Sequence, residues 1–276
     1  MNKFESANQL LSFYSKNLLD APEVCARGTK QKERIFQSFQ ITDPSRINIT
    51  IPQRKFNKNY AIAEWLWYLS SNPNVDNIGK LAKIWVMISD QHSEVESNYG
   101  VYLRPQWNWV KSEIIRDNDT RRATFVINQP HHKYKNPKDY PCTQYVQFFV
   151  RDDKLHLGVN MRSNDLIFGL CNDVFTFALF QQLMLNELNE SGLNLELGSY
   201  FHQAGSLHVY ERHFDMIENI ANSSFSIDKK EETCRLDEGL TWQLADERFS
   251  LPVANIEKDL IYDYVKKYSK EIFDVR

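Results

Sequence analysis

Two short strand-like runs followed by a long apolar helix constrain the fold of this chain more than any other feature. Residues 144–150 and 155–161 are rich in β-branched and aromatic side chains and are separated by a short polar turn, which predicts a β-hairpin. Asn172 and Asp173 then supply N-cap chemistry for an apolar helix over 174–190. Strands and a long helix in one continuous stretch predict an α+β domain.

Apolar residues at helical spacing predict further helices over 5–19 and 61–70, and a short β-rich run predicts a strand over 206–210. Four apolar positions predict an amphipathic helix near the end of the sequence: Ile256, Leu260, Tyr264 and Tyr268. There is no repeat and no linker rich in Pro, Gly or Ser. We therefore expect a single domain over residues 1–276, in which the polar stretch 222–250 forms a flexible excursion.

Charge and cysteine usage exclude several classes of protein. The 33 Lys and Arg against 36 Asp and Glu leave a net charge of −3, which offers no excess positive field for polymeric nucleic acid. The four cysteines contain no CxxC pair, so neither a zinc site nor a disulfide framework is indicated. No apolar stretch approaches the ~20 residues that span a bilayer, and the first residues lack the apolar core of a signal peptide. We expect a cytoplasmic enzyme or binding protein without a membrane partner, whose nucleic-acid chemistry, if any, concerns a single nucleotide or a local patch.

Cys142 is the candidate nucleophile. It opens the first strand of the hairpin, and an Arg-Ser-Asn-Asp cluster at 162–165 closes the second. The turn folds one strand back beside the other, so the cysteine and the cluster are expected to converge. An arginine close to a thiol lowers the pKa of that thiol and favours the thiolate. Taken alone, a cysteine in this position is more commonly an inert core residue.

Glu64 is the second unusual residue. It is the only charged residue in the helix over 61–70, which is otherwise apolar almost all round. Burying a carboxylate is costly, so Glu64 needs either a partner or a function. The structural alternative is a glutamate at the rim of the helix, paired with an arginine.

Several motifs stand in a fixed order along the chain. They are Arg27, the helix around Glu64, Ile84-Trp85, Ser97-Asn98-Tyr99-Gly100, Arg121-Arg122, Pro141-Cys142, the Arg-Ser-x-Asp motif at 162–165, Gly169 and the His-x-Tyr motif at 208–210. In this order and spacing they resemble the thymidylate synthase superfamily, and most closely its phage-type deoxycytidylate (dCMP) 5-hydroxymethylases. The resemblance covers about residues 20–215 and does not extend to the C-terminal part.

The resemblance implies a mixed β-sheet packed against a long central helix, with one face of the sheet forming a homodimer interface. It also implies a pyrimidine nucleoside monophosphate as substrate, 5,10-methylenetetrahydrofolate as co-substrate, and no metal. Cys142 would be the nucleophile that adds to carbon 6 of the pyrimidine and makes carbon 5 reactive. Glu64 and Tyr99 would handle protons through ordered water, a task that suits a desolvated carboxylate with a raised pKa.

The binding roles follow from the same resemblance. The phosphate cradle would consist of Arg27, Arg121, Arg122, Arg162 and Ser163, because guanidinium groups match phosphate oxygens in pairs. Arg121 and Arg122 would reach across from the second subunit. The sugar 3′-hydroxyl would be bound by His208 and Tyr210, and the folate by Trp85, Asp165 and Gly169. Considered alone, the arginine pair is more commonly a solvated surface charge, and His208 a core histidine.

Asp173 is an informative departure from thymidylate synthases, in which the aligned residue is an asparagine that reads uracil. Cytosine presents an unprotonated ring nitrogen and an exocyclic amine, and a carboxyl group with one shared proton can match both. Asp173 therefore favours a cytosine nucleotide. Alternatively Asp173 is a simple helix N-cap, or Asn172 reads the base if the register slips by one. Thr143 replaces the histidine that follows the cysteine in most thymidylate synthases, and this departure also favours a cytosine nucleotide.

The fate of the one-carbon unit depends on water. A methylene group on carbon 5 takes water to give hydroxymethyl, or hydride to give methyl. The C-terminal residues 270–276 do not resemble the apolar tail of thymidylate synthases, which favours water. The sequence predicts a dCMP hydroxymethylase. The alternatives are a C5 methylase acting on dCMP or dUMP, a CMP hydroxymethylase, and a catalytically inactive nucleotide-binding regulator.

The adjacent histidines His131 and His132 are a candidate metal or phosphate patch. The sequence offers no third ligand at a spacing typical of metal sites. The pair therefore predicts an exposed loop.

Overall fold

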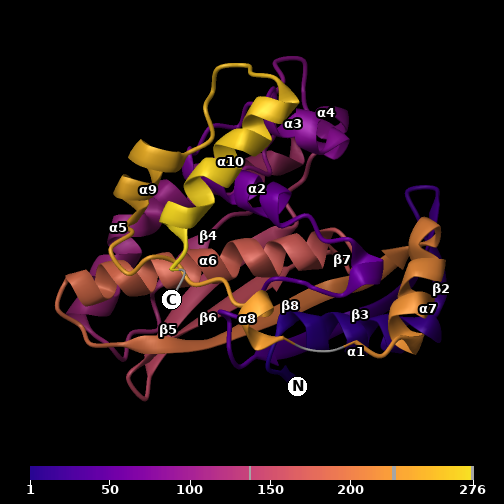
Figure 1. Cartoon of the computed structure of the whole chain (residues 1–276), viewed down its shortest axis with the longest axis horizontal. Helices are drawn as coiled ribbons and strands as arrows, with labels where there is room; N and C mark the ends of the chain where they lie inside the picture. Colours follow the sequence, from indigo (N-terminus) through magenta and orange to yellow (C-terminus); the bar gives the residue numbers. More distant parts are fainter. Residues whose placement is uncertain (137, 226–227, 275–276) are drawn as a thin grey trace.

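The computed structural model describes residues 1–136, 138–225 and 228–274. A mixed sheet crosses the molecule in the order β1-β3-β8-β6-β5-β4, while β2 pairs with β3 and β7 pairs with β8 (Figure 1). The strands are β1 (Asn2–Phe4), β2 (Glu23–Ala26), β3 (Thr29–Ile41), β4 (Thr124–Val126), β5 (Thr143–Arg151), β6 (Lys154–Met161), β7 (Asn164–Asp165) and β8 (Glu196–Tyr210).

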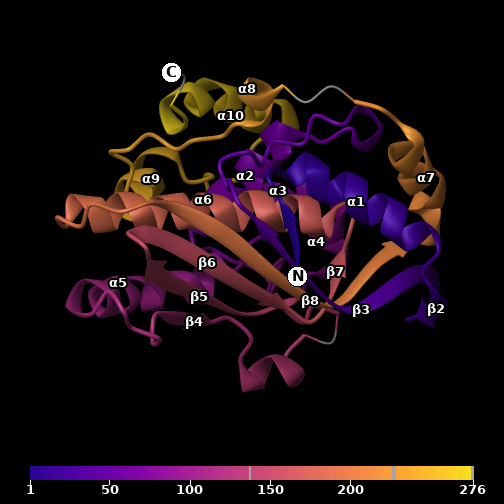
Figure 2. The ribbon, with the colours of Figure 1, turned by 90° about the horizontal axis from the view of Figure 1, so that it is seen from below.

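Helices cover one face of this sheet. They are α1 (Ala7–Leu19), α2 (Lys58–Leu69), α3 (Ile78–Leu81), α4 (Lys83–Ile88), α5 (Gly100–Arg116), α6 (Gly169–Glu190), α7 (Phe214–Asn222), α8 (Lys229–Glu232), α9 (Trp242–Phe249) and α10 (Lys258–Ile272). The long helix α6 lies across the sheet, and α2, α9 and α10 lie beyond it (Figures 1 and 2). Most of α6 is buried because it is enclosed between these layers. A mixed sheet packed on a long helix is the expected architecture.

The predicted hairpin is confirmed. β5 and β6 pair antiparallel, and the turn residues Asp152 and Asp153 have φ of +52° and +54°. Two successive left-handed residues match the right-handed twist of the strands they join. β6 then pairs in parallel with β8, so the strand predicted over 206–210 is only the end of a longer strand that begins at Glu196.

Helix α6 begins at Gly169, earlier than predicted. The reason is Asp165, whose Oδ2 accepts hydrogen bonds from the backbone N–H groups of Phe168 (2.8 Å) and Gly169 (3.4 Å). This carboxylate satisfies N–H groups that the opening of a helix leaves without partners. The N-cap predicted at Asn172 and Asp173 is therefore wrong, and both residues lie inside the helix.

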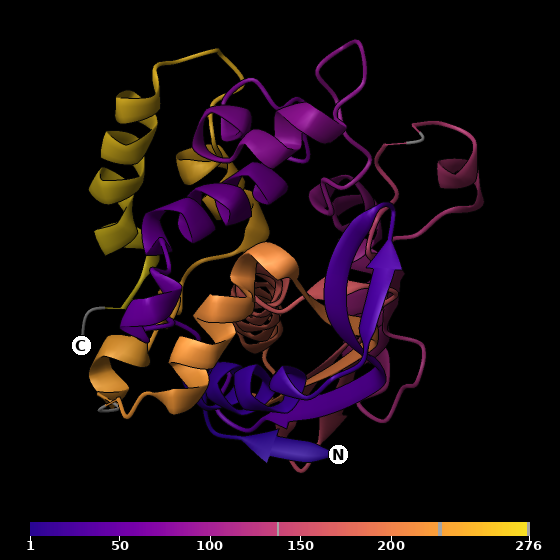
Figure 3. The ribbon, with the colours of Figure 1, turned by 90° about the vertical axis from the view of Figure 1, so that its right-hand side faces the viewer.

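The stretch 222–250 was expected to form a flexible excursion. Where the structure describes it, this stretch packs against the core. Residues 226 and 227 lie outside the described residues. Trp242 is buried and stacks on Phe180 with ring centroids 5.1 Å apart. Its Nε1 donates to the carbonyl oxygen of Leu69, 3.3 Å away. One large aromatic side chain can anchor a segment that is otherwise polar. Further along the chain, α10 packs along α2 (Figure 3).

A buried carboxylate on α8 joins this helix to residues near the N-terminus and to Arg46. Glu232 at the end of α8 is fully buried and accepts hydrogen bonds from Arg46 Nη2 (2.6 Å) and Nε (3.0 Å). It also accepts from Ser6 Oγ (2.9 Å) and Asn8 Nδ2 (2.7 Å). If the carboxylate were removed, four hydrogen bonds would be lost, and the buried Arg46 guanidinium would keep only the exposed Glu5 carboxylate, 2.9 Å away, as a counter-charge.

We expect Glu232→Ala to lower the free energy of unfolding by about 3–5 kcal/mol, as for other buried ion pairs that lose one partner. Urea denaturation of the full chain measures this. Glu271→Ala is the matched control, since it removes an exposed ion pair with Arg248 and should cost about 1 kcal/mol or less. Equal losses in the two variants would contradict a dominant role for the Glu232 cluster.

The other face of the sheet carries aromatic residues that stay partly exposed, among them Tyr145, Phe149 and Phe201. They alternate along β5 and β8 with residues that point into the core, such as Val146 and Phe148. This is the face expected to form a homodimer interface. Among the described residues, no helix combines the length and the apolar character needed to cross a membrane.

Candidate active site

The β5–β6 hairpin brings together Cys142, directly before β5, and Arg162, directly after β6, as predicted. Arg162 donates its backbone N–H to the carbonyl of Cys142 (2.9 Å). Its side chain is fixed by two further carbonyls, with Nε donating to Pro141 (3.1 Å) and Nη2 to Tyr140 (2.5 Å). The guanidinium also lies over the Tyr140 ring, 4.9 Å from its centroid. Arg162 therefore supplies a fixed positive charge beside the half-buried thiol.

The pKa of the Cys142 thiol is nevertheless raised above its usual value. Burial is the largest cause, and the nearby carboxylates of Asp173 and Asp139 act in the same direction. Arg162 and, more weakly, Arg27 lower the pKa but do not outweigh the burial. Arg162 therefore acts in the expected direction, but desolvation of the thiolate costs more than the guanidinium returns.

Glu64 is buried on α2, and its partner is a tyrosine. Tyr60 Oη donates to Glu64 Oε1 at 2.6 Å, and Trp85 Nε1 donates to Tyr60 Oη at 3.0 Å. Burial raises the pKa of Glu64 to about 8, opposed by the Tyr60 hydrogen bond and reinforced by Asp173. The alternative of a rim glutamate paired with an arginine is therefore wrong. Sequence reasoning missed Tyr60, although it lies four residues before Glu64 and so on the same face of the helix.

Asp173 lies on the side of α6 that faces the nucleophile, since its charge acts on Cys142, Glu64 and Tyr99. Burial raises its pKa to about 7, with a smaller contribution from Asp165. At neutral pH this carboxyl group therefore exists in both protonated and ionised forms. The neighbouring Asn172 is rotated by about 100° around the helix axis.

Asn164 holds Asp173 in place, a contact that sequence reasoning missed. Its Nδ2 donates to Asp173 Oδ2 at 2.7 Å, and its buried Oδ1 has no hydrogen-bond partner. A Cβ on Gly169 would lie 3.0 Å from that Nδ2, so glycine at this position leaves room for the contact. An acceptor that is buried without a partner is costly, so Asn164 Oδ1 is available to a donor from a bound molecule or from water.

Tyr99 stands at the start of α5, stacked between Tyr68 and Phe177 at centroid distances of 5.2 and 5.5 Å. Burial, followed by Asp173 and Cys142, raises the pKa of its hydroxyl above the usual value, so it stays protonated at neutral pH. The position depends on Gly100, because a Cβ there would lie 1.6 Å from the carbonyl oxygen of Tyr68.

Three further predicted residues gather where β7 meets β8. Asp165 pairs in register with His208, and His208 packs edge-on against Tyr210 at 5.0 Å. His208 Nδ1 lies 3.2 Å from Ser206 Oγ, and burial lowers the pKa of the ring. Asp165 uses Oδ2 to open α6, while its buried Oδ1 has no partner. This oxygen can therefore accept a hydrogen bond from a bound molecule.

Arg27 also approaches this cluster, whereas two other arginines do not. Arg27 sits at the turn between β2 and β3, with φ of +52°, and its charge lowers the pKa of both Cys142 and Tyr210. Arg121 and Arg122 are exposed on the loop between α5 and β4. There Arg122 pairs with Glu113 (3.3 Å) and lies over a tryptophan ring. Ser163 is half-buried between Arg162 and Asn164.

The histidine pair acquires a third polar partner that its spacing did not reveal. Ligand atoms of Glu96, His131 and His132 lie within 4.8 Å of one another, and His132 is buried rather than exposed as expected. His132 Nδ1 accepts the backbone N–H of Gln129 (3.0 Å), so the neutral ring carries its proton on Nε2, beside Tyr102 Oη (2.7 Å). A metal ion would have to displace that proton, so the group is better described as a hydrogen-bonded cluster.

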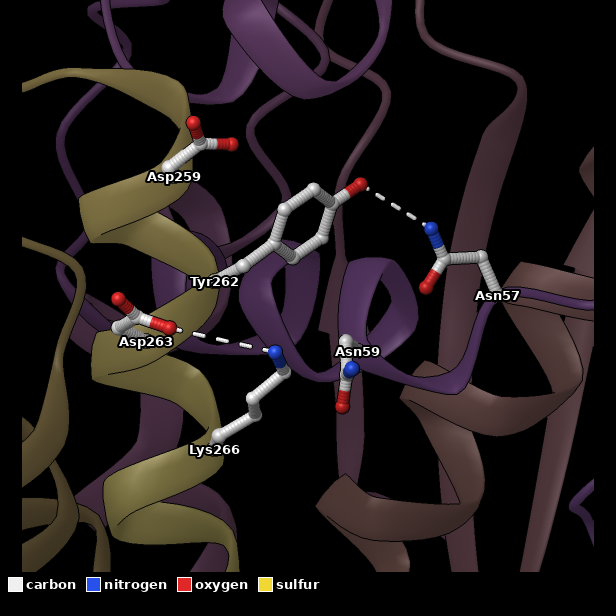
Figure 4. Close-up of a pocket in the computed structure, with 6 residues that line it drawn as sticks. All are labelled: Asn57, Asn59, Asp259, Tyr262, Asp263 and Lys266. Carbon is white, nitrogen blue, oxygen red and sulfur yellow. Dashed lines mark hydrogen bonds and ion pairs between the residues drawn. The ribbon is translucent and has the colours of Figure 1, made fainter.

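Two surface hollows lie away from Cys142. One, of about 730 Å³, adjoins Glu96 and His131. The other, of about 420 Å³, lies between the start of α2 and helix α10 (Figure 4). Its polar groups already contact one another, Asn57 Nδ2 donating to Tyr262 Oη (3.0 Å) and Lys266 lying 3.9 Å from Asp263. Neither hollow contains a residue of the cluster around Cys142.

Comparisons with known proteins agree with this arrangement. A family model described as thymidylate synthase matches residues 23–231. The deoxycytidylate 5-hydroxymethyltransferase of Enterobacteria phage T2 is 31% identical over 208 residues, which cover 71% of this chain and 82% of the phage protein. The protein of the same name from Enterobacteria phage T4 is 31% identical over 204 residues, covering 70% and 80%.

A relative with a different substrate in its name is also similar. The deoxyuridylate hydroxymethyltransferase of Delftia phage PhiW-14 is 28% identical over 203 residues, which cover 67% of this chain and 55% of that protein. The match of the family model extends over most of the chain and includes Cys142 and Arg162. The chain therefore belongs to the thymidylate synthase family, and it is an enzyme that transfers a one-carbon unit to carbon 5 of a nucleotide.

Proposed function

We propose that this enzyme is a deoxycytidylate 5-hydroxymethylase, which converts dCMP, 5,10-methylenetetrahydrofolate and water into 5-hydroxymethyl-dCMP and tetrahydrofolate. The observation that carries the proposal is the Asp173 carboxyl group, which faces Cys142, has a pKa of about 7 and is held by Asn164. The names of the relatives from phages T2 and T4, at 31% identity, support the same substrate and product.

Asp173 suits cytosine because of where its proton can be. Asn164 donates to Oδ2, so Oδ2 acts as an acceptor and a proton on the carboxyl group resides on Oδ1. The protonated Oδ1 can donate to the ring nitrogen of cytosine, while Oδ2 and the unpartnered Oδ1 of Asn164 can accept from the exocyclic amine. Uracil would place its oxygen against these acceptors and its ring N–H against the Asp173 proton, a mismatch of buried polar groups.

Cys142 then acts as the nucleophile. Its thiolate forms a bond to carbon 6 of the pyrimidine, which makes carbon 5 nucleophilic enough to accept the one-carbon unit. Arg162 and Arg27 offset part of the cost of ionising the buried thiol, and with Ser163 they are our proposed ligands of the phosphate dianion. We assign His208 and Tyr210 to the sugar hydroxyl.

Glu64 and Tyr99 handle the protons. With a pKa of about 8, Glu64 exists in both protonated and ionised forms near neutral pH, so it can give or take a proton there. Tyr99 stays protonated at neutral pH, so its hydroxyl can donate or accept a hydrogen bond and can supply a proton, but it cannot start the reaction as a base. The Asp173 charge raises the pKa of both groups, so we treat the three as one coupled proton-handling unit.

The residues predicted for the folate fit that molecule. The family implies methylenetetrahydrofolate as co-substrate, and it supplies the one-carbon unit. The buried, unpartnered Oδ1 of Asp165 is an acceptor suited to a pterin N–H, and the buried Trp85 is joined to Glu64 through the Tyr60 hydroxyl. Gly169 lies against Asn164 and Asp173, so its role is at least partly to make room for the base-reading pair.

Mass spectrometry of the products tests the proposal. The enzyme is incubated with a mixture of dCMP, CMP and dUMP and with methylenetetrahydrofolate, and 5-hydroxymethyl-dCMP is the expected product. A methylated product with a rise in dihydrofolate absorbance would show that hydride rather than water ends the reaction. Hydroxymethyl-dUMP or hydroxymethyl-CMP as the main product would contradict the reading of Asp173 or of the sugar.

We also propose a homodimer across the exposed face of the sheet, in which Arg121 and Arg122 complete the phosphate site of the partner. Within one chain these arginines lie outside the Cys142 cluster, although the family pattern assigns them to the phosphate. Mixing Cys142→Ser chains with chains carrying Arg121→Ala and Arg122→Ala should restore turnover that neither variant shows alone. If subunit exchange is demonstrated and no turnover returns, the shared site is excluded.

A further inference from the structure

Tyr60 connects two residues of the proposed site. It lies one helical turn before Glu64 on α2, and its hydroxyl is 2.6 Å from Glu64 Oε1. On its other side the hydroxyl is 3.0 Å from Trp85 Nε1 on α4. Tyr60 therefore joins the helix that carries the proton-handling carboxylate to the helix that carries the predicted folate contact.

The direction of these hydrogen bonds is fixed by chemistry. An indole N–H can only donate, so the Tyr60 oxygen must be the acceptor from Trp85. The single hydroxyl proton of Tyr60 is then directed to Glu64 Oε1. Because Oε1 accepts this proton, a proton carried by Glu64 resides on Oε2. The two oxygens of the carboxyl group thus become chemically different.

The charges around Glu64 leave the Tyr60 hydrogen bond as the main influence that favours the ionised form. Burial disfavours ionisation, and the Asp173 carboxylate on α6 acts in the same direction. Tyr68, on α2 itself, also senses the charge of Glu64 but stays neutral because its own pKa is raised well above the usual value. Removal of the Tyr60 hydroxyl is therefore expected to make Glu64 harder to ionise.

We propose that Tyr60 is a positioning residue that, held by Trp85, occupies Oε1 of Glu64 and so makes Oε2 the oxygen that exchanges protons during the reaction. The role of Oε2 in catalysis rests on the proposed function. The orientation of the Glu64 carboxyl group rests on the hydrogen bonds alone. Tyr60 itself does not need to contact the nucleotide or the folate.

Tyr60→Phe tests the proposal because it removes one oxygen and leaves the ring. In chains labelled with ¹³C at the glutamate side-chain carboxyl, the resonance that disappears in Glu64→Gln belongs to Glu64. Its titration should move to higher pH by about one unit in Tyr60→Phe, the size expected for the loss of a hydrogen bond to a charged group. Tyr14→Phe is the control, since it removes a buried tyrosine hydroxyl on α1, outside the site. The control should leave the titration unchanged.

The pH profile of tritium release from carbon 5 of the nucleotide gives a second readout. In Tyr60→Phe, the limb of the pH–rate profile that reports the ionisation of Glu64 should also move to higher pH. This holds whether the ionised or the protonated form of Glu64 is active, since one pKa governs both forms. A merely structural role would lower activity at all pH values without moving the limb. An unshifted carboxyl titration in Tyr60→Phe overturns the inference, even if the enzyme releases tritium normally. Absence of tritium release in the wild type contradicts the proposed function instead, and leaves the titration as the test of Tyr60.

A second variant keeps the test decisive if Tyr60→Phe does not fold. Trp85→Phe removes the donor that holds the Tyr60 oxygen but leaves Tyr60 in place. Its Glu64 titration, measured in the free protein, should also move to higher pH, by less than in Tyr60→Phe. No movement would overturn the proposed path from Trp85 through Tyr60 to Glu64.

Discussion

Replacing Cys142 by serine should abolish turnover of dCMP while leaving nucleotide binding nearly unchanged. A serine hydroxyl is far less acidic than a thiol, and Arg162 and Arg27 do not outweigh the cost of burial even for the thiol. The loss in kcat should be on the order of 10⁴-fold or more, as for other enzymes that lose their nucleophile. Tritium release from carbon 5 measures turnover, and equilibrium dialysis with labelled dCMP measures binding.

The controls for this variant separate chemistry from folding. Cys25→Ser changes an exposed cysteine outside the site and should keep full activity. Binding of dCMP should survive in Cys142→Ser because Arg162 is anchored by the carbonyls of Tyr140 and Pro141, which the substitution leaves in place. Turnover within tenfold of the wild type would exclude Cys142 as the nucleophile. Wild-type protein that binds dCMP but turns over no nucleotide would favour an inactive regulator.

Replacing Asp173 by asparagine should shift the preference of the enzyme from dCMP towards dUMP. The carboxyl group keeps Oδ2 as an acceptor and so has no donor for the exocyclic oxygen of uracil. An amide can be turned about its terminal bond, so that it accepts from the ring N–H of uracil and donates to the uracil oxygen. We expect the ratio of kcat/KM for dCMP to that for dUMP to fall by roughly 10²- to 10⁴-fold, the range in which unpaired buried polar groups discriminate.

Competition between the two nucleotides in one reaction measures that ratio directly. Asn172→Ala is the matched control, because it changes the neighbouring residue that would read the base if the register were shifted by one. Its ratio should stay as in the wild type. An unchanged ratio in Asp173→Asn would remove Asp173 from the specificity argument, and a changed ratio in Asn172→Ala alone would transfer the role to Asn172.

Much of the framework of the site was predictable because it depends on local pattern. The β5–β6 hairpin follows from strand-forming runs around a polar turn, and it places Arg162 beside Cys142. The burial of Glu64 follows from the apolar residues on every side of α2. In both cases, neighbours within a few residues decide the structure.

Other parts depend on contacts that the sequence does not display. β3 was missed because its first half is charged and its burial does not alternate clearly, although it pairs with both β2 and β8. The start of α6 was misplaced because a carboxylate outside the helix, Asp165, satisfies its first N–H groups. The roles of Tyr60 and Asn164 depend on single hydrogen bonds of 2.6 and 2.7 Å, which residue type alone cannot reveal.

The C-terminal segment forms the outer wall of the helix that carries Glu64. Leu251 donates its backbone N–H to the carbonyl of Leu66 on α2, and Trp242 donates to that of Leu69. Exchanging this segment for the tail of another family member would remove those donors and expose the outer side of α2. The tail therefore cannot be treated as an interchangeable appendage, and chimaeric enzymes that keep every catalytic residue but swap the tail are expected to lose the alignment of their proton-handling carboxylate.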